Sequence, residues 1–262
     1  MIALAHRFLT AGVLVIWSAA LCFFYFSGRI TAYLHPTFQP YALACGITLG
    51  IFAILVLLSP EEAVIGASGC EPGKPRSTFG SLVLALILVV PLVVTMAFSR
   101  DEFSAVTVLN RGYVDSVTQV PANLTFAQPA LPGEEVGPGD DEVPEMPPPE
   151  IIDLLYAAQL PELRAEIEDK PIELIGQFMP AEESNPDGNR FRLVRMMMMC
   201  CASDAQPISV IVEADAAKDF KEMTWVKVAG RTKFPVIDGQ LRPLLKADSV
   251  VQTDPPKDPF LY

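Results

Sequence analysis

Three long apolar stretches dominate the first hundred residues of the chain. They run from Phe8 to Phe26, from Tyr41 to Leu58 and from Leu82 to Phe98, and none of them contains a charged residue. About 20 residues of α-helix cross a hydrocarbon layer roughly 30 Å thick. The stretches therefore predict three transmembrane helices, with a kink at Pro91 in the third. The first stretch exceeds the apolar core of a cleaved signal peptide, which is about 7 to 15 residues long.

The charges of the chain separate into two regions. Residues 1–99 hold 4 Lys+Arg against 3 Asp+Glu, a net charge of +1, whereas residues 100–262 hold 15 against 28, a net charge of −13. An acidic region repels the phosphate backbone of nucleic acids. The second region is therefore expected to bind no nucleic acid, and the first is expected to contact membrane lipids.

Three spans place the two chain termini on opposite sides of a membrane. Basic residues are more frequent in cytoplasmic loops. The N-terminus and second loop carry Arg7, Lys74 and Arg76, and the first loop and the flank after the third span carry Arg29, Arg100 and Arg111. Together with the terminal amine, these residues weakly favour a cytoplasmic N-terminus and an extracytoplasmic C-terminal domain. His35 is interpreted as an interfacial residue that caps the first loop.

The remainder of the chain is expected to form three segments. Residues 100–127 connect the membrane domain (1–99) to a linker, and Val106–Val114 within them is a candidate short strand. Residues 128–150 are rich in proline and acids, a composition typical of an extended tether. Residues 151–262 are long enough to form an independent soluble domain.

The soluble domain begins with helical patterns and continues with strand patterns. Apolar spacing predicts a helix at Ile151–Gln159, and Pro161 suits the first turn of a second helix, Pro161–Asp169. Turns are expected at Asn185–Asn189 and Ile237–Gly239, and a helical turn at Asp215–Glu222. The predicted strands are Ile172–Met179, Arg190–Met199, Ile208–Glu213, Trp225–Thr232 and Gln240–Val251, the last with an interruption.

These elements predict membrane helices followed by a mainly β domain. Five strands with a short helix between the third and the fourth suggest an OB-like barrel, and an open antiparallel sheet is the alternative. Arg190, Arg192 and Arg195 on the second strand are expected to be solvated. Side chains alternate along a strand, so two of the methionines at 196–199 are expected to fill the core and two to form an outward contact surface.

Adjacent cysteines, Cys200 and Cys201, follow the methionines, and Asp204 lies three residues further on. Neighbouring side chains of a strand point to opposite faces, so both thiols reach one ligand only where the backbone leaves strand geometry. The functional hypothesis is a site for a thiophilic metal ion, zinc or copper, formed by these three residues. The alternative places one cysteine in the core and the other in a turn where Asp204 binds backbone amides. A disulfide between adjacent residues is considered less favourable than free thiols.

The residues around the cysteine pair resemble a known family. The block MMMMCCASDAQP, followed by an apolar strand and WVKVAGR, resembles the C-terminal domain of the YcgQ-like family of permease subunits. The hallmark Cys-Cys-x-x-Asp-Ala-x-Pro is met by Cys200, Cys201, Asp204, Ala205 and Pro207. The likeness extends to the three spans and to the two short helices before Ile172. It implies a larger multi-span partner, a YcgR-like permease subunit.

Three functions follow as hypotheses. The first is a non-enzymatic accessory subunit of a membrane permease, because three spans are too few for a carrier built from internal repeats. The second is a membrane-tethered protein that binds or delivers a metal through Cys200, Cys201 and Asp204. A thiol-redox enzyme is the third and the least favoured, because reactive pairs usually have two intervening residues. The sequence contains no hydrolase triad, phosphate-binding loop or paired catalytic carboxylates.

Overall fold

The computed structural model describes residues 2–59, 78–116, 148–181, 185, 188–214, 220–237 and 239–262. The chain divides into two compact units, Met1–Glu102 with Cys200–Ser203 and Phe103–Met199 with Asp204–Tyr262. Predictions for the loop between the second and third spans and for most of the linker lie outside the described residues. Of the helical turn predicted at Asp215–Glu222, only residues 220–222 are described, and they are not helical.

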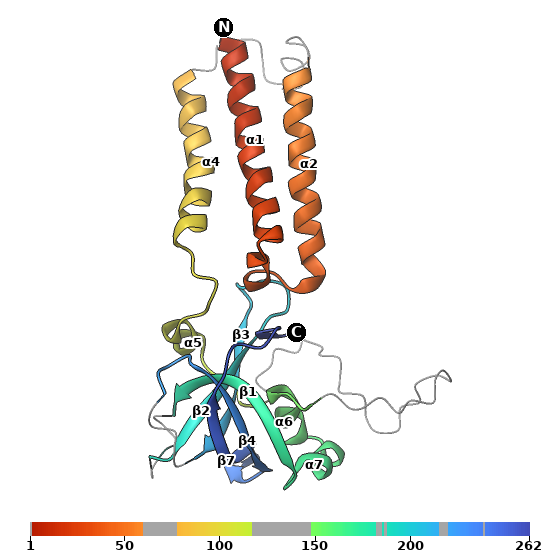
Figure 1. Cartoon of the computed structure of the whole chain (residues 1–262), viewed down its shortest axis with the longest axis vertical. Coiled ribbons are helices and arrows are strands. Elements are labelled where there is room, and N and C mark those ends of the chain that lie inside the picture. Colours follow the sequence, from red (N-terminus) through yellow and green to blue (C-terminus); the bar gives the residue numbers. More distant parts are fainter. Residues whose placement is uncertain are drawn as a thin grey trace, which may run out of the picture. The chain divides into compact units, whose positions relative to one another are not determined.

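The first unit contains the three predicted spans. They are α1 (Ile2–Phe26), α2 (Gln39–Leu58) and α4 (Thr78–Phe98), and all three are long and apolar enough to cross a membrane. Helix α1 lies between α2 and α4 and contacts both (Figure 1). Pro91 is inside α4, and the Thr95 hydroxyl donates to its carbonyl at 2.7 Å. The three predicted helices are confirmed, and each begins a few residues earlier than predicted.

Small residues allow α1 and α2 to pack closely. Gly46 and Ala53 on α2 are buried. A β-carbon added to Gly46 would lie 3.0 Å from the Leu21 Cβ, and one added to Gly50 would lie 2.9 Å from the Ser18 Oγ. Glycines four residues apart are a common means of close packing between membrane helices. The α1–α2 contact therefore depends on the absence of side chains at these positions.

The first loop consists of the short 3-10 helices η1 (Arg29–Ala32) and η2 (Pro36–Phe38). The Nδ1 of His35 accepts a hydrogen bond from the Thr37 N–H at 3.2 Å at the start of η2, which confirms the capping interpretation of His35. Arg29 donates to the Asp101 carboxylate at 2.8 Å and thereby joins this loop to the segment after α4. This hydrogen bond lowers the pKa of Asp101.

The second unit begins with a helix where a strand was proposed. Residues Ala105–Arg111 form α5 instead of part of a Val106–Val114 strand. Ser104 caps its first turn by accepting from the Thr107 N–H, and Gly112 ends the helix with a φ of 73°. Only Val114 makes a strand-like contact, a single parallel bridge to Ile208. The predicted helices are confirmed as α6 (Ile151–Ala157) and α7 (Pro161–Ile167).

The β domain is a mixed sheet. The strands are β1 (Pro171–Pro180), β2 (Arg190–Met197), β3 (Gln206–Glu213), β4 (Trp225–Lys233), β5 (Val236–Ile237), β6 (Gln240–Leu241), β7 (Leu244–Gln252) and β8 (Phe260–Leu261). The main sheet has the order β1-β4-β7-β3-β2-β8, and β1 also pairs with β2. Strands β3–β7 and β2–β8 are parallel, and the other neighbours are antiparallel. The predicted strands are confirmed, with β6 and β7 forming the interrupted last one, whereas β5 and β8 were not predicted.

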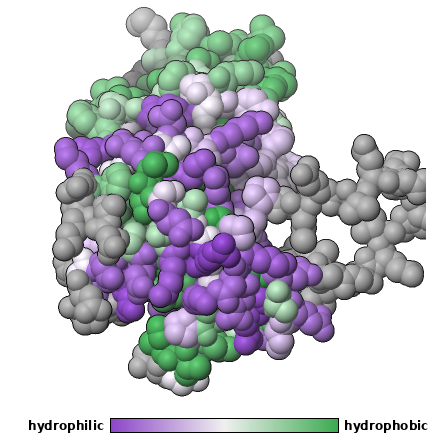
Figure 2. Space-filling view, turned by 60° about the horizontal axis from the view of Figure 1, so that its bottom comes forward, coloured by the Kyte–Doolittle hydropathy of each residue, from purple (hydrophilic) through white to green (hydrophobic). Residues whose placement is uncertain are grey.

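The core of the domain lies between the sheet and helices α6 and α7. Alternate positions on the central strands face inward and are fully buried, as in Leu193 of β2, Val210 of β3 and Val228 of β4. Leu154 and Leu155 of α6 are also fully buried in this cluster. The described surface in Figure 2 is largely hydrophilic over the β domain. This packing fixes the two strands, β2 and β3, whose connection carries the cysteine pair.

Candidate metal site

Strand β2 is covered more completely than its sequence suggested. Met196, Met197 and Met198 are 2%, 2% and 0% exposed. Strand β8 pairs with Met196 and Met197, and the Met198 N–H donates to the Leu261 carbonyl at 2.9 Å. The predicted outward methionine surface is therefore wrong, because three of the four side chains are buried. Strand β8, from about sixty residues away, also lies beside β2, so β2 is not an edge strand at this point.

The three arginines of β2 also differ from the solvated charges that were predicted. Arg190 pairs with Glu213 at 3.0 Å, and this contact lowers the pKa of Glu213. Arg195 is buried and donates to the carbonyls of Asp258 and Phe260 and to Glu150. Its partners are 45 to 65 residues away in the sequence, so no local pattern could have revealed its burial.

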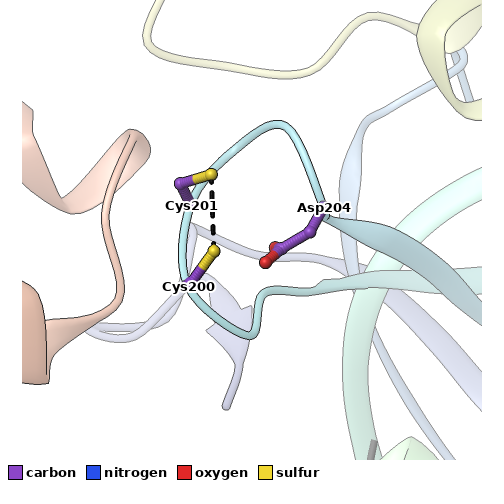
Figure 3. Close-up of side chains that lie close together, drawn as sticks. All are labelled: Cys200, Cys201 and Asp204. Atoms are coloured by element: carbon purple, nitrogen blue, oxygen red, sulfur yellow. Dashed lines mark hydrogen bonds between the residues drawn. The ribbon is translucent and has the colours of Figure 1, made fainter. Parts of the chain in front are cut away.

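The cysteine pair lies where the backbone leaves the strand. Strand β2 ends at Met197 and β3 begins at Gln206, and the pair falls in the connection between them. Cys200 is exposed, Cys201 is half-buried, and neither is part of a disulfide. Their sulfur atoms are 3.6 Å apart, and the Cys200 thiol donates to that of Cys201 (Figure 3). The expected departure from strand geometry is confirmed, and neither cysteine is in the core.

Asp204 completes the group. Its carboxylate points toward the two sulfurs in Figure 3, and one ligand atom from each of Cys200, Cys201 and Asp204 lies within 4.8 Å of the others. The Asp204 Oδ1 also accepts a hydrogen bond from the Met199 N–H at 3.2 Å. The backbone contact of the alternative interpretation is therefore present, and it orients the carboxylate toward the thiols. These three residues could hold a metal ion.

Backbone contacts within the first unit hold the cysteine segment. The His35 N–H donates to the Cys200 carbonyl at 3.1 Å, and the Ala202 N–H donates to the Tyr33 carbonyl at 2.8 Å. Leu34 and Cys201 form an antiparallel bridge between these two bonds. On the other side of the connection, the Arg111 guanidinium donates to the Ala205 carbonyl. Sequence reasoning did not find these anchors, because each joins segments more than 90 residues apart.

The separation of the two sulfurs limits which ion fits. With zinc–sulfur bonds of about 2.3 Å, sulfurs 3.6 Å apart subtend an angle of about 103°, near the tetrahedral value of roughly 109°. A linear two-coordinate ion with bonds of that length would need sulfurs about 4.6 Å apart. A carboxylate is a hard ligand that suits zinc better than Cu(I). Of the two predicted metals, the arrangement fits tetrahedral zinc better.

The fold and this loop define a class of protein. A protein of this class has three N-terminal helices able to cross a membrane, followed by a mixed β-sheet domain. The connection between β2 and β3 in that domain contains two adjacent cysteines. The DUF1980 N-terminal domain matches residues 9–114, and the DUF1980 C-terminal domain matches residues 154–262. The chain therefore belongs to the DUF1980 family.

Other comparisons add little to this assignment. No curated protein matches the chain. A crystal structure of the small single-stranded DNA-binding protein from Streptomyces coelicolor is similar at 13% sequence identity, and the match covers 33% of this chain and 94% of that chain with a TM-score of 0.24. At that TM-score the likeness carries no argument about this chain.

Proposed function

We propose that this protein is a membrane-anchored, non-enzymatic metal-binding protein that holds a thiophilic divalent ion, zinc above all, through Cys200, Cys201 and Asp204. The observation that carries the proposal is the convergence of two sulfurs and a carboxylate oxygen within 4.8 Å. Zinc sites use these ligand types, and a site with three protein ligands keeps one coordination position for an external ligand.

The properties of the three residues suit transient binding. Metal binding requires both thiols as thiolates, so the affinity should fall as the pH is lowered. Cys200 is exposed and Cys201 half-buried, so an ion can enter and leave without unfolding of the domain. Asp204 is held by the Met199 amide and adds a charge that partly balances the ion. An open coordination position would then let a partner's ligand take over the metal.

Elemental analysis of the full chain in a neutral detergent tests the proposal. The wild-type protein should retain one zinc ion per chain after gel filtration, and Cys200→Ser and Cys201→Ser should each lose it. The matched controls are Cys22→Ser in α1 and Cys45→Ser in α2, which should keep it. Equal zinc content in all five proteins, or no zinc in any of them, would contradict the proposal.

A second candidate function is that of an accessory subunit of a larger multi-span permease, such as the YcgR-like partner that the resemblance implies. It is supported by the placement of Cys200–Ser203 in the same compact unit as the three spans. The spans also expose large apolar side chains, such as Ile47 and Phe52 on α2 and Ile87 on α4, which can face lipid or a partner helix. Co-purification in mild detergent should recover a polytopic partner, and isolation of this chain alone would count against the assignment.

Two finer structural statements belong to the proposal. An OB-like barrel is supported by the two pairings of β1. Because β1 pairs with both β4 and β2, the series of paired strands that starts at β1 and runs through β4, β7, β3 and β2 leads back to β1. An extracytoplasmic β domain is supported by the weak bias of basic residues described above. A phosphatase fused after Tyr262 should then be active, since that enzyme requires the oxidising exterior. Activity of a reporter that works only in the cytoplasm would reverse the orientation.

A further inference from the structure

A cavity of about 440 Å³ lies in the second unit, formed entirely by residues outside the cysteine segment. Strand β2 contributes Arg192 to its wall, and the end of β1 contributes Met179 and Pro180. Leu109 of α5 and the following residues Tyr113 and Asp115 form another side. Helix α5, which lies where a strand was predicted, therefore forms part of the cavity wall.

Arg192 is the one cation among the described residues that line this cavity. Its side chain is only 13% exposed. It makes one hydrogen bond among the described residues, to the Ser209 hydroxyl at 3.3 Å, and its nearest carboxylate oxygen, on Asp115, is 3.9 Å away. That same oxygen is 2.7 Å from Arg242, which is its closer partner. A guanidinium has five N–H donors, so Arg192 keeps donor capacity in a largely buried place.

The surroundings of Arg192 fix its orientation and add an apolar wall. Its guanidinium lies over the Tyr113 ring, 4.6 Å from the centroid, a cation–π arrangement that holds the planar group. Leu109 and Pro180 supply hydrocarbon surface in the same cavity, with the buried Met179 behind them. A guanidinium group beside apolar side chains can recognise a carboxylate attached to a short hydrocarbon chain.

Negative groups in the cavity restrict the charge of the ligand. Glu222 and Asp115 also line it. Two carboxylates repel an anion that carries several charges, such as phosphate or a polyphosphate, more strongly than one that carries a single charge. We propose that the cavity binds a small organic monocarboxylate, with its carboxylate on Arg192 and its hydrocarbon part against Leu109 and Pro180. This site is independent of the metal site and of any function assigned to it.

Butyrate is a suitable probe for the full-length protein in a neutral sugar detergent. Titration calorimetry or ligand-observed NMR should show saturable butyrate binding, no binding of butanol, which lacks the charge, and weaker binding of inorganic phosphate. Arg192→Gln should weaken butyrate binding at least tenfold, because hydrogen bonds to charged groups are among the strongest in proteins. Arg190→Gln is the matched control on the same strand, and it should bind like the wild type because Arg190 is engaged by Glu213.

A second variant keeps the test independent of the folding of Arg192→Gln. Leu109 is 56% exposed, so Leu109→Trp should fill the cavity from the α5 side without disturbing the core, and should abolish butyrate binding. The inference is overturned if butyrate does not bind saturably to the wild type, if Leu109→Trp binds it unchanged, or if phosphate binds more tightly than butyrate.

Discussion

Replacing Arg195 with methionine should loosen the C-terminal strand from the β domain. Arg195 donates to the carbonyls of Asp258, just before β8, and of Phe260, its first residue, at 2.5 and 3.1 Å. Its third contact is an ion pair with Glu150 at 3.2 Å, the residue before α6. One buried side chain thus joins β2, β8 and the start of α6.

The size of the effect follows from these contacts. A hydrogen bond to a charged group contributes about 1.5 to 3 kcal/mol to stability. Glu150 is 49% exposed on its side chain, so the ion pair adds at most about 1 kcal/mol. Methionine keeps part of the apolar contact of the arginine stem. It also removes the buried Arg195 Nε, which has no hydrogen-bond partner among the described residues. We expect Arg195→Met to lower the free energy of unfolding by about 2 to 4 kcal/mol.

Urea unfolding in detergent micelles measures this loss. In a Trp17→Phe background, Trp225 on β4 is the remaining tryptophan and reports on the β domain. The control is Arg190→Met on the same strand, whose partly exposed ion pair with Glu213 should contribute at most about 1 kcal/mol. Hydrogen exchange should also accelerate at the Met198 amide, which is bonded to Leu261. Equal unfolding free energies for Arg195→Met and Arg190→Met would refute the clamp role of Arg195.

Three further predictions concern packing, charge and capping. Gly46→Ala should lower the thermal midpoint of unfolding in detergent, because the added Cβ would lie 3.0 Å from the Leu21 Cβ. The control Gly12→Ala should leave the midpoint unchanged, because the space around Gly12 is open. An equal effect of the two substitutions would count against close α1–α2 packing. Glu213→Gln should destabilise the domain by up to about 1 kcal/mol at pH 7. Because the folded pKa of Glu213 is lowered, its contribution is complete above its unfolded pKa of about 4.3 and disappears as the pH falls through the folded value. Urea curves for Glu213→Gln and wild type should therefore converge once the pH is below the folded pKa, and a difference that stays constant with pH would exclude the ion pair as its cause. Ser104→Ala should cost about 1 kcal/mol through loss of the α5 cap, detectable as faster amide exchange in α5, and unchanged exchange would contradict the capping role.

The sequence predicts well those elements that local patterns specify. The three spans follow from length and apolar character, and the strands from alternation between turns. The convergence of Cys200, Cys201 and Asp204 was also predictable, because the three residues lie within five positions and the turn that gathers them is local. The hydrogen bonds that hold the cysteine segment were not predictable, because they join it to Tyr33 and His35, which are far away in the sequence.

Most of the errors originate in long-range contacts, and one originates in an ambiguous local pattern. Strand β8 has only two residues and no pattern of its own, yet it pairs with Met196 and Met197, which are buried instead of forming an outward surface. Helix α5 was misassigned because Val106–Val114 mixes apolar and polar residues at intervals that fit either structure, and the cap at Ser104 decides between them. The cavity around Arg192 could not be predicted from the sequence, because it combines residues from β1, β2 and α5.

Cobalt substitution tests the metal proposal most directly. The full chain, purified without metal and titrated with Co²⁺, should develop thiolate-to-cobalt absorption and the intense visible bands of a tetrahedral site, saturating at one ion per chain and bleached by one equivalent of zinc. Asp204→Asn should shift the visible bands, and Cys200→Ser or Cys201→Ser should weaken binding and reduce the thiolate band. A spectrum of octahedral, sulfur-free cobalt that is the same in the wild type and in both cysteine variants would contradict the assignment of a metal to this loop.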